Sequence, residues 1–431
     1  MIAGPGEPIA TAALGDRIDP SKAPRPSNEG ERLLFRQVYE TLIRVDCNGH
    51  VRPGLAASWR LDADGRTWIV TLREDARFSD GTAVTPIDVR ASWTRDGSGS
   101  ELRPDVGRLV RSIVPIDDRN VAITLRGRQA DVPVALAHTD LAIARAVADS
   151  RWPLGTRTDG AALEPEAPGG GAASVITVKR HTAPPLRFVV AAGDPRDVLD
   201  DGVDLLLTRD PGALNYAATL PDFQAVPLEW GRIHALLTPG RTRESPLPSE
   251  EARQTLATDA VRGESRGAVG PFWWQTLQDC ETTTPQPPNQ SAPTSRIVYD
   301  ARDGAARDLA ERLVGLARDS DPHATALLNL LLPDPARRTS QRANGLTGEP
   351  LARARRLGTD AGYIVPLDRR PLDPCRDVQV VMDSAPWLDP EAIVPLVETR
   401  LRAIARRGRS GISAEWDGGL VIAGASEPEL R

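Results

Sequence analysis

The segment from Val38 to Trp93 constrains the fold more than any other part of this sequence. Its apolar residues first recur at helical spacing and then alternate as in a half-buried strand, with turn residues between the two patterns. Asp64-Gly65, flanked by alternating residues, predicts a β-hairpin. Thr85 with Asp88 three residues later predicts a capping box at the start of a helix. The segment therefore predicts a helix end, two strand pairs and a second helix.

The order of short motifs in this segment resembles that of the peptide- and nickel-binding branch of solute-binding protein family 5, whose members serve ABC importers. The shared motifs are Tyr39-Glu40-Thr41-Leu42, Asp46 to Gly49, Pro53 to Trp59, Asp64-Gly65, Leu72-Arg73, Phe78 to Thr85 and Asp88 to Trp93. The resemblance covers about the first quarter of the chain and weakens beyond it. It implies an α/β, two-lobe periplasmic-binding-protein-like fold of class II, with discontinuous lobes and an extra small sub-lobe of strands.

Length and composition agree with a protein of two lobes. The chain has 431 residues, which exceeds one ordinary domain. Hydrophobic residues make up 40% and charged residues 26%, as is typical of a globular protein with a large core. The net charge of -6 and the lack of a basic tract argue against nucleic acid or an anionic membrane surface as a partner. No apolar run reaches the length of a membrane span.

The resemblance also predicts how the chain divides. Lobe I covers residues 1–241 with the sub-lobe at about 46–165, lobe II covers 242–365, and residues 366–431 return to lobe I. The predicted hinges are Leu237 to Pro239 and Val365 to Leu367. Elements predicted in the second half are helices at Glu250–Val261 and Ala305–Ala317, strands at Arg296–Asp300 and Tyr363–Leu367, and a helix or strand–helix element at Ile393–Ile404.

The N-terminal residues do not form a signal peptide, because Met1 to Pro8 lacks both a basic start and an apolar stretch. Members of the family work outside the cytoplasmic membrane. We therefore expect a trimmed, mature-like chain with an added Met. Its full-length form would be periplasmic or extracellular and anchored to the membrane.

Three cysteines allow at most one bridge within the chain. Cys280 and Cys375 both lie next to loop-like segments, so we predict a disulfide between them and leave Cys47 alone. Closing so long a loop stabilises a fold by roughly 4–5 kcal/mol in the chain-entropy model. The alternative is three reduced, buried thiols. The spacing of the cysteines and histidines fits no metal site.

No catalytic motif is present in the sequence. The five histidines are scattered, and the chain has no G-x-S-x-G, H-E-x-x-H or G-x-x-x-x-G-K pattern. A Ser-His-Asp triad stays open, because its members need not be neighbours in sequence. We predict a binding protein that is not an enzyme and uses no cofactor or metal.

One segment carries the main prediction about the ligand. In peptide-binding relatives, the segment that crosses between the lobes reads approximately G-W-x-x-D-Y-x-D-P, and its first Asp pairs with the peptide amine. The matching stretch here is Pro366 to Pro374, which places Arg370 at the amine-binding position. An arginine favours a carboxylate or phosphate, which it binds through two parallel hydrogen bonds. The alternative is an alignment that slips by a residue or two, with Arg369 and Arg370 solvated.

Aromatic and polar residues near the inferred crossings complete the candidate ligand site, because two-lobe proteins bind ligands where the lobes meet. They are Trp273, Trp274, Trp230, Trp387, Tyr363, Asn215, Tyr216 and Thr238. The alternatives are that the tryptophans belong to the core and that Asn215 and Tyr216 lie on a plain helix surface.

These observations predict an extracytoplasmic solute-binding protein of an ABC importer. It would capture a small molecule or short peptide between its lobes and deliver it to a membrane permease, and it would act as a monomer. The second hypothesis is a sensory or scaffold protein of the same fold without a transport role. An enzyme is the third.

Overall fold

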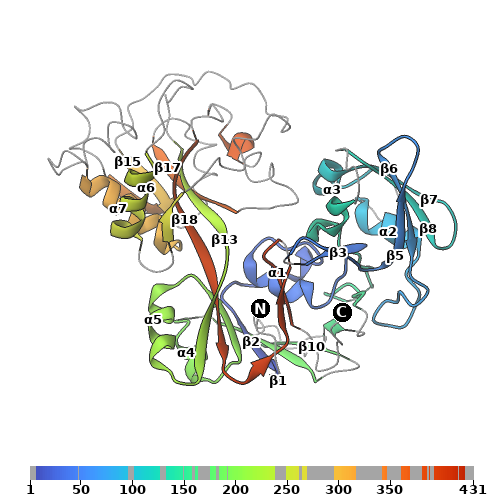
Figure 1. Ribbon diagram of the computed structural model, residues 1–431, viewed down its shortest axis with the longest axis horizontal. Helices are drawn as coiled ribbons and strands as arrows, with labels where there is room; N and C mark the ends of the chain where they lie inside the picture. The colour runs from blue at the N-terminus through green and yellow to red at the C-terminus, as the bar shows by residue number, and fades with distance from the viewer. Residues whose placement is uncertain are drawn as a thin grey trace. The chain divides into compact units, whose positions relative to one another are not determined.

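The computed structural model describes residues 6–46, 48–95, 101–126, 133–148, 150–157, 161–163, 175–180, 184–191, 193–237, 249–261, 265–268, 296–316, 342–346, 361–368, 381–385, 388, 393–415 and 417–422. The chain divides into two compact units, whose elements are labelled in Figure 1. Unit 1 comprises Met1–Thr208, Asn215–Val226 and Ala403–Arg431, and unit 2 comprises Arg209–Leu214 and Pro227–Arg402. Two long strands, β13 (Phe223–Leu237) and β18 (Ile393–Arg406), have residues in both units.

The main sheet of unit 1 is built around β2 (Thr11–Leu14). This strand runs parallel to β11 (Leu186–Val190) and to β12 (Leu205–Thr208), and its residues Ala12 to Leu14 are fully buried. The sheet continues antiparallel through β10 (Val175–Lys179) to β9 (Ala162–Leu163). Shorter elements complete the unit: β1 (Glu7–Pro8) with β19 (Arg409–Ser410), β3 (Ile43–Val45) with β4 (Val51–Pro53), β20 (Ile412–Ala414) with β21 (Leu420–Ile422), α1 (Glu29–Arg36), α4 (Asp197–Asp200), α5 (Pro211–Thr219), whose first residues fall in unit 2, and three 3-10 turns at Pro20–Lys22, Val134–Ala137 and Thr139–Leu141.

A separate four-stranded antiparallel sheet confirms the hairpin predicted at Asp64-Gly65. Its order is β5 (Ala56–Leu61), β6 (Thr67–Leu72), β8 (Asn120–Leu125) and β7 (Val110–Pro115). Trp68 on β6 is buried, as is Trp93 at the end of α2 (Pro86–Trp93), whereas Trp59 is half-buried. The short helix α3 (Pro104–Leu109) leads into β7. Figure 1 shows α2 beside this sheet.

The capping box predicted at α2 is confirmed. Asp88 accepts hydrogen bonds from Thr85 N at 2.8 Å and Thr85 Oγ1 at 2.6 Å, and Thr85 Oγ1 accepts in turn from Asp88 N. Thr85→Ala removes the hydroxyl from both bonds, so we expect the free energy of unfolding to fall by about 1 kcal/mol. Urea unfolding would measure this. Ser58→Ala, on an exposed strand position, is the control, and equal losses in the two variants would contradict the prediction.

Unit 2 is a mixed sheet with helices packed on one of its faces. The strand order is β16 (Arg342–Leu346), β15 (Arg296–Asp300), β17 (Gly362–Asp368), β13 and β18, and β14 (Ser265–Gly267) also pairs with β18. β15 runs parallel to both β16 and β17, whereas β17 and β13 are antiparallel. Helices α6 (Glu250–Ala260) and α7 (Gly304–Leu316) share a hydrophobic core with Leu236, Ile297 and Ile364, and Figure 1 shows the two helices side by side. The helices and strands predicted here from Glu250 to Leu367 are thus confirmed where the structure describes them.

The element predicted as a helix or strand–helix at Ile393–Ile404 is wrong. The whole segment is one strand, β18, and its first five residues are buried. Leu, Arg, Ala and Glu favour a helix in isolation, but the propensity of such residues is weak, and tertiary context overrides it routinely. Pairing of β18 with strands on both sides outweighs the local preference of this segment.

The residues of the predicted hinge at Val365 to Leu367 lie inside β17 and wholly in unit 2, and their role as a hinge stays a prediction. There they pair with β13 and pack in its core. The strands that have residues in both units are β13 and β18. The division of the chain into units falls after Val226 and after Arg402, while the lobe boundaries at 241 and 365 stay predictions. Within the described residues, no helix is long and apolar enough to cross a membrane.

Candidate functional site

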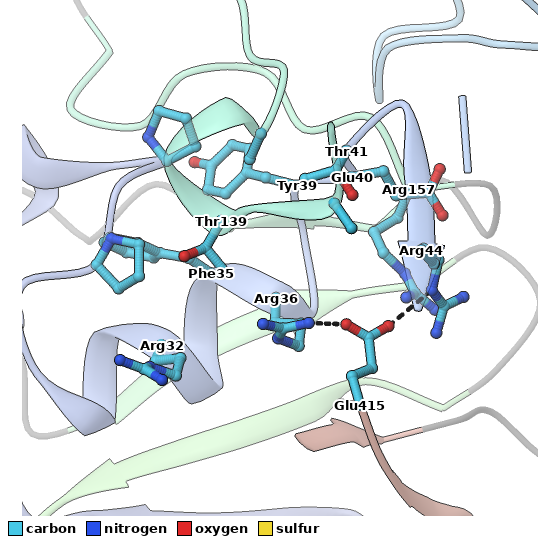
Figure 2. Close-up of a pocket in the computed structure, with 14 residues that line it drawn as sticks. Arg32, Phe35, Arg36, Tyr39, Glu40, Thr41, Arg44, Thr139, Arg157 and Glu415 are labelled. Carbon is cyan, nitrogen blue, oxygen red and sulfur yellow. Dashed lines mark hydrogen bonds and ion pairs between the residues drawn. The ribbon is translucent and has the colours of Figure 1, made fainter. Parts of the chain in front are cut away.

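Unit 1 contains a small polar pocket, shown in Figure 2. Its walls come from α1, from the residues that follow this helix, from the segment around Thr139, and from two positions far along the chain. Aromatic, proline, alanine and threonine side chains form the uncharged part of the wall. Its charged residues are Arg32, Arg36, Arg44, Arg157, Glu40 and Glu415.

Helix α1 places three of the lining residues, and Tyr39 follows in the turn after the helix. Arg32 and Arg36 are four residues apart and therefore lie on the same side of the helix. Phe35 and Tyr39 have the same spacing, and Tyr39 N donates to Phe35 O in the turn that follows the helix. The rings of Phe35 and Tyr39 contact edge to face at 5.9 Å between centroids. Burial raises the pKa of Tyr39, so its hydroxyl stays neutral, and it donates to Pro153 O at 3.2 Å.

The loop before α1 is fixed by Glu31, a carboxylate that is only 1% exposed. Its oxygens accept from Asp19 N at 3.0 Å, from Ser27 N at 2.7 Å and from Ser27 Oγ at 2.7 Å. Asn28 caps the helix by accepting from Glu31 N. These bonds hold the two prolines of the loop, Pro24 and Pro26, at the pocket wall.

One of the two acidic residues of the pocket, Glu415, comes from the C-terminal hairpin. Glu415 pairs with Arg36 and, at 2.8 Å, with Arg44 Nε, and Figure 2 draws both contacts. Arg36 also pairs with Asp417 in the hairpin turn. Burial raises the pKa of Asp417, but the charges of Arg36 and Arg32 outweigh burial and hold that pKa below its ordinary value of 3.8. Asp417 is therefore ionised at neutral pH, and together with Glu415 it fixes Arg36 in the wall.

Arg157 reaches the pocket from a segment that is bound to the residues after α1. Thr156 N and Arg157 N both donate to Val38 O, at 3.0 and 3.2 Å. Thr156 Oγ1 accepts from Glu40 N at 2.9 Å and donates to Ile143 O at 3.1 Å. These four bonds fix the backbone at Thr156 and Arg157. The side chain of Arg157 is buried and is labelled in Figure 2.

Unit 2 has its own polar cluster on β13. Trp230, Arg232 and His234 are two residues apart and therefore share one face of the strand. Arg232 Nε donates to Asp368 at 2.7 Å, where β17 ends. His234 is 1% exposed, and its Nε2 lies 3.1 Å from Asp303 at the start of α7. The cluster thus gathers at the carboxyl ends of β15 and β17, where open α/β sheets place ligands.

Replacement of Asp303 by Asn tests the electrostatic part of this cluster. Burial raises the pKa of Asp303, but the charge and hydrogen bond of His234 outweigh burial and hold the pKa well below 3.8. At acidic pH the folded protein therefore keeps Asp303 ionised, whereas the unfolded chain binds a proton at this residue. The stabilisation is present above about pH 4 and falls by about 1.4 kcal/mol per pH unit below it.

Asp303→Asn should remove this slope from the free energy of unfolding below pH 4, because Asn still caps α7 but carries no charge. Urea unfolding between pH 2.5 and 6 measures the slope. Asp118→Asn, in an exposed turn, is the matched control and should keep the wild-type slope. Identical slopes in both variants would show that the Asp303 charge contributes nothing.

The predicted ligand residues that the structure describes do not line the pocket. Trp230 lies under two guanidinium groups, with Arg266 at 4.4 Å and Arg400 at 4.6 Å from its ring centroid. Tyr363 is fully buried in the core of unit 2. On α5, Asn215 is exposed, and the Tyr216 hydroxyl donates to Asp200 at 2.5 Å. A ligand contact by any of these residues stays a prediction.

The remaining predicted residues lie outside the described part of the chain. They are Arg369, Arg370, Trp273, Trp274, Trp387, Thr238 and the cysteines Cys280, Cys375 and Cys47. Among the described residues, no group of three or more His, Cys, Asp and Glu could hold a metal ion.

Sequence reasoning missed the arginines of the pocket and their partner Glu415. Tyr39 and Glu40 belong to a recognised motif, but Arg36, three residues before Tyr39, did not draw attention. Glu415 and Asp417 flank Trp416 in a segment for which no site residue was predicted. The one available signal was the spacing of Arg32 and Arg36 beside Tyr39, which places two cations next to an aromatic residue.

Comparisons with known proteins agree with the fold. The family model for bacterial extracellular solute-binding proteins, family 5 (middle), matches residues 50–164. The chain is similar to a putative binding protein of Haemophilus influenzae, with 30% identity over 131 residues, which are 26% of this chain and 25% of that protein. It is also similar to the periplasmic oligopeptide-binding protein OppA of Escherichia coli, with 43% identity over 74 residues, 17% and 13% of the two chains. These alignments span a quarter or less of the relatives' length.

A likeness to solved structures extends over nearly the whole chain. The crystal structure of a dipeptide-binding protein from Pseudoalteromonas sp., in complex with Met-Leu, superposes with a TM-score of 0.63 at 12% identity. The match covers 97% of this chain and 100% of that chain. It shows that the discontinuous α/β units described above form the two-lobe periplasmic-binding fold.

Proposed function

We propose that this chain, whose residues 50–164 match the model of family 5 of the bacterial extracellular solute-binding proteins, captures a small solute outside the cytoplasm and delivers it to the permease of an ABC importer. The solute is peptide-like or another small, anionic molecule. The protein acts as a monomer and is anchored to the membrane. Within the family, proteins of this kind bind their solutes and do not transform them.

The pocket of unit 1 is the observation that carries this proposal. It is concave and partly buried, and its lining combines charged, hydroxyl-bearing and aromatic side chains. A lining of this kind suits the binding of a small polar solute.

Native mass spectrometry of the purified protein tests the proposal, followed by denaturation and identification of any released compound. A small molecule at one equivalent per chain is the expected result. If the protein is empty, a thermal-shift panel of peptides, opines, sugars and metal chelates decides the question. No shift with any of them would overturn the proposal and favour a sensory or scaffold protein.

Delivery to a permease needs its own experiment. Deletion of the gene should abolish uptake of the identified solute by intact cells, and a plasmid copy should restore it. Normal uptake in the deletion strain would separate binding from transport and overturn the importer role alone.

A further inference from the structure

We propose that His138 is a pH switch in the wall of the unit 1 pocket. Its neutral imidazole fixes the wall and protonation releases it, so that a solute is held at neutral pH and lost in an acidic medium. The inference rests on the proposed function and concerns the regulation of the same site.

His138 lies in a segment that forms part of the pocket wall. Its neighbours Ala137 and Thr139 line the pocket, as does Ala142, and Thr139 is labelled in Figure 2. His138 itself is outside the lining and is only 5% exposed. A change at His138 therefore reaches the pocket through the backbone of its two neighbours.

The imidazole of His138 holds this backbone in place. Its Nδ1 accepts a hydrogen bond from Asp140 N at 3.1 Å and so caps the 3-10 turn at Thr139–Leu141. The turn then closes with a bond from Leu141 N to His138 O at 2.9 Å. An imidazole nitrogen accepts a hydrogen bond only when it carries no proton, so His138 is neutral in this arrangement.

Protonation turns the acceptor into a donor. An N–H group on Nδ1 would face the N–H group of Asp140, and two donors cannot share a hydrogen bond. A carboxylate oxygen of Asp140 lies 3.7 Å from Nδ1, and Asp140 is only 1% exposed. The imidazolium therefore turns from the backbone of Asp140 to its carboxylate, because a buried charge needs a charged partner. The turn loses its cap, and the wall of the pocket shifts.

The remaining bonds of the turn do not depend on His138, so its protonation shifts the wall without unfolding the unit. Arg103 Nη2 donates to Asp140 O at 3.0 Å, and Trp93 Nε1 donates to Leu141 O at 3.1 Å. These bonds use carbonyl groups, whereas the imidazole holds an amide. The release is therefore confined to this turn.

Charges on the surrounding elements set the pH at which the turn is released. The charged residues of these elements are Asp140 on the turn itself, Arg103, Asp105 and Arg108 at α3, Asp88 and Arg90 on α2, Arg25 before α1, Glu40 after it, and Arg44 on β3. Asp140 attracts a proton to His138, and the charge of Arg103 repels it. Imidazole groups titrate between pH 5 and 8, so we expect the transition within this range.

Hydrogen–deuterium exchange of the full chain between pH 5.0 and 7.5, corrected for the intrinsic exchange rates, tests the switch. In the wild type, protection of the Asp140 amide should fall about tenfold or more as the pH is lowered. His138→Asn should keep its protection at both ends of the range, because Asn is a good capping residue and does not titrate there. His50→Asn, at an exposed histidine, is the matched control and should behave like the wild type.

Equal protection of Asp140 at both pH values in the wild type would overturn the proposal, as would the same loss in His138→Asn. The wild type decides even if His138→Asn does not fold. The amides of β6 have no histidine partner and should keep their protection, so a parallel loss in β6 would mean general acid unfolding and refute the switch.

Native mass spectrometry at pH 7.5 and 5.0 measures the effect on the compound that the purified protein retains. At pH 5.0 the wild type should retain at least about tenfold less of this compound than His138→Asn. Equal retention by the two proteins would refute release through His138 while the binding function stands. A pH-dependent turn in a protein that retains no compound would support the switch and count against the proposed function.

Discussion

Arg36→Ala should lower the free energy of unfolding by about 3–5 kcal/mol, the usual cost of removing one partner from a buried ion pair. Arg36 joins α1 to the C-terminal hairpin through Glu415 and Asp417, positions about 380 residues away in sequence. Its side chain is 9% exposed, and those of Glu415 and Asp417 are 12% and 16% exposed. Without Arg36, Asp417 keeps a poorly hydrated negative charge and loses the larger of the two cationic contributions that offset it, while that of Arg32 remains.

Neighbouring contacts cannot replace this ion pair. Gln37 also links α1 to the hairpin, because its Nε2 donates to Leu420 O at 2.9 Å and its Oε1 accepts from Ile422 N at 2.9 Å. Those hydrogen bonds are neutral and leave the charges of Glu415 and Asp417 unchanged. Arg44 still pairs with Glu415, so Asp417 is the residue that loses most.

A double-mutant cycle separates charge from packing. Unfolding in guanidinium chloride measures the stability of Arg36→Ala, of Asp417→Asn and of the double variant. We expect the double variant to be more stable than Arg36→Ala alone, because it no longer buries an uncompensated charge. Arg60→Ala, at an exposed position, should change stability by less than about 0.5 kcal/mol. If Arg36→Ala loses no more than Arg60→Ala, the ion pair has no structural role.

The parts of the fold that could be predicted from sequence are those fixed by local chemistry. The turn at Asp64-Gly65, the box of Thr85 and Asp88, and the helical stripe of Leu309, Leu313 and Leu316 each need only a few adjacent residues, and the structure has all three. The order of such elements between Val38 and Trp93 was specific enough to indicate a family and therefore the two-lobe fold.

Elements that depend on distant partners could not be predicted in the same way. β18 has a helix-like composition and becomes a strand because strands pair with it on both sides. The pocket has the same origin, since its wall joins residues near position 36 with Arg157 and Glu415. No periodicity connects such positions, so only the folded chain brings these charges together.

Gly155→Ala should destabilise the protein by about 3 kcal/mol, at the upper end of the range for overpacked sites. A Cβ atom at this position would lie 2.5 Å from Val38 Cγ1, 2.6 Å from Val38 O and 2.9 Å from Ala161 O. Two of these contacts are backbone oxygens, which no change of rotamer can move. The backbone around Gly155 is also bound in place, because Gly155 O accepts from Ser79 N at 2.9 Å.

The same substitution should weaken binding in the pocket. Val38 O, which the new methyl group would displace, accepts the hydrogen bonds from Thr156 N and Arg157 N that position Arg157. Gly107→Ala is the control, and it should change the free energy of unfolding in the opposite direction. Gly107 lies in α3 with open space around it, so alanine there should stabilise the helix by about 0.5–1 kcal/mol. Thermal unfolding of the two variants distinguishes them. A Gly155→Ala protein as stable as the wild type would mean that the segment before Arg157 moves freely, and such a segment could not hold Arg157 in place for a ligand.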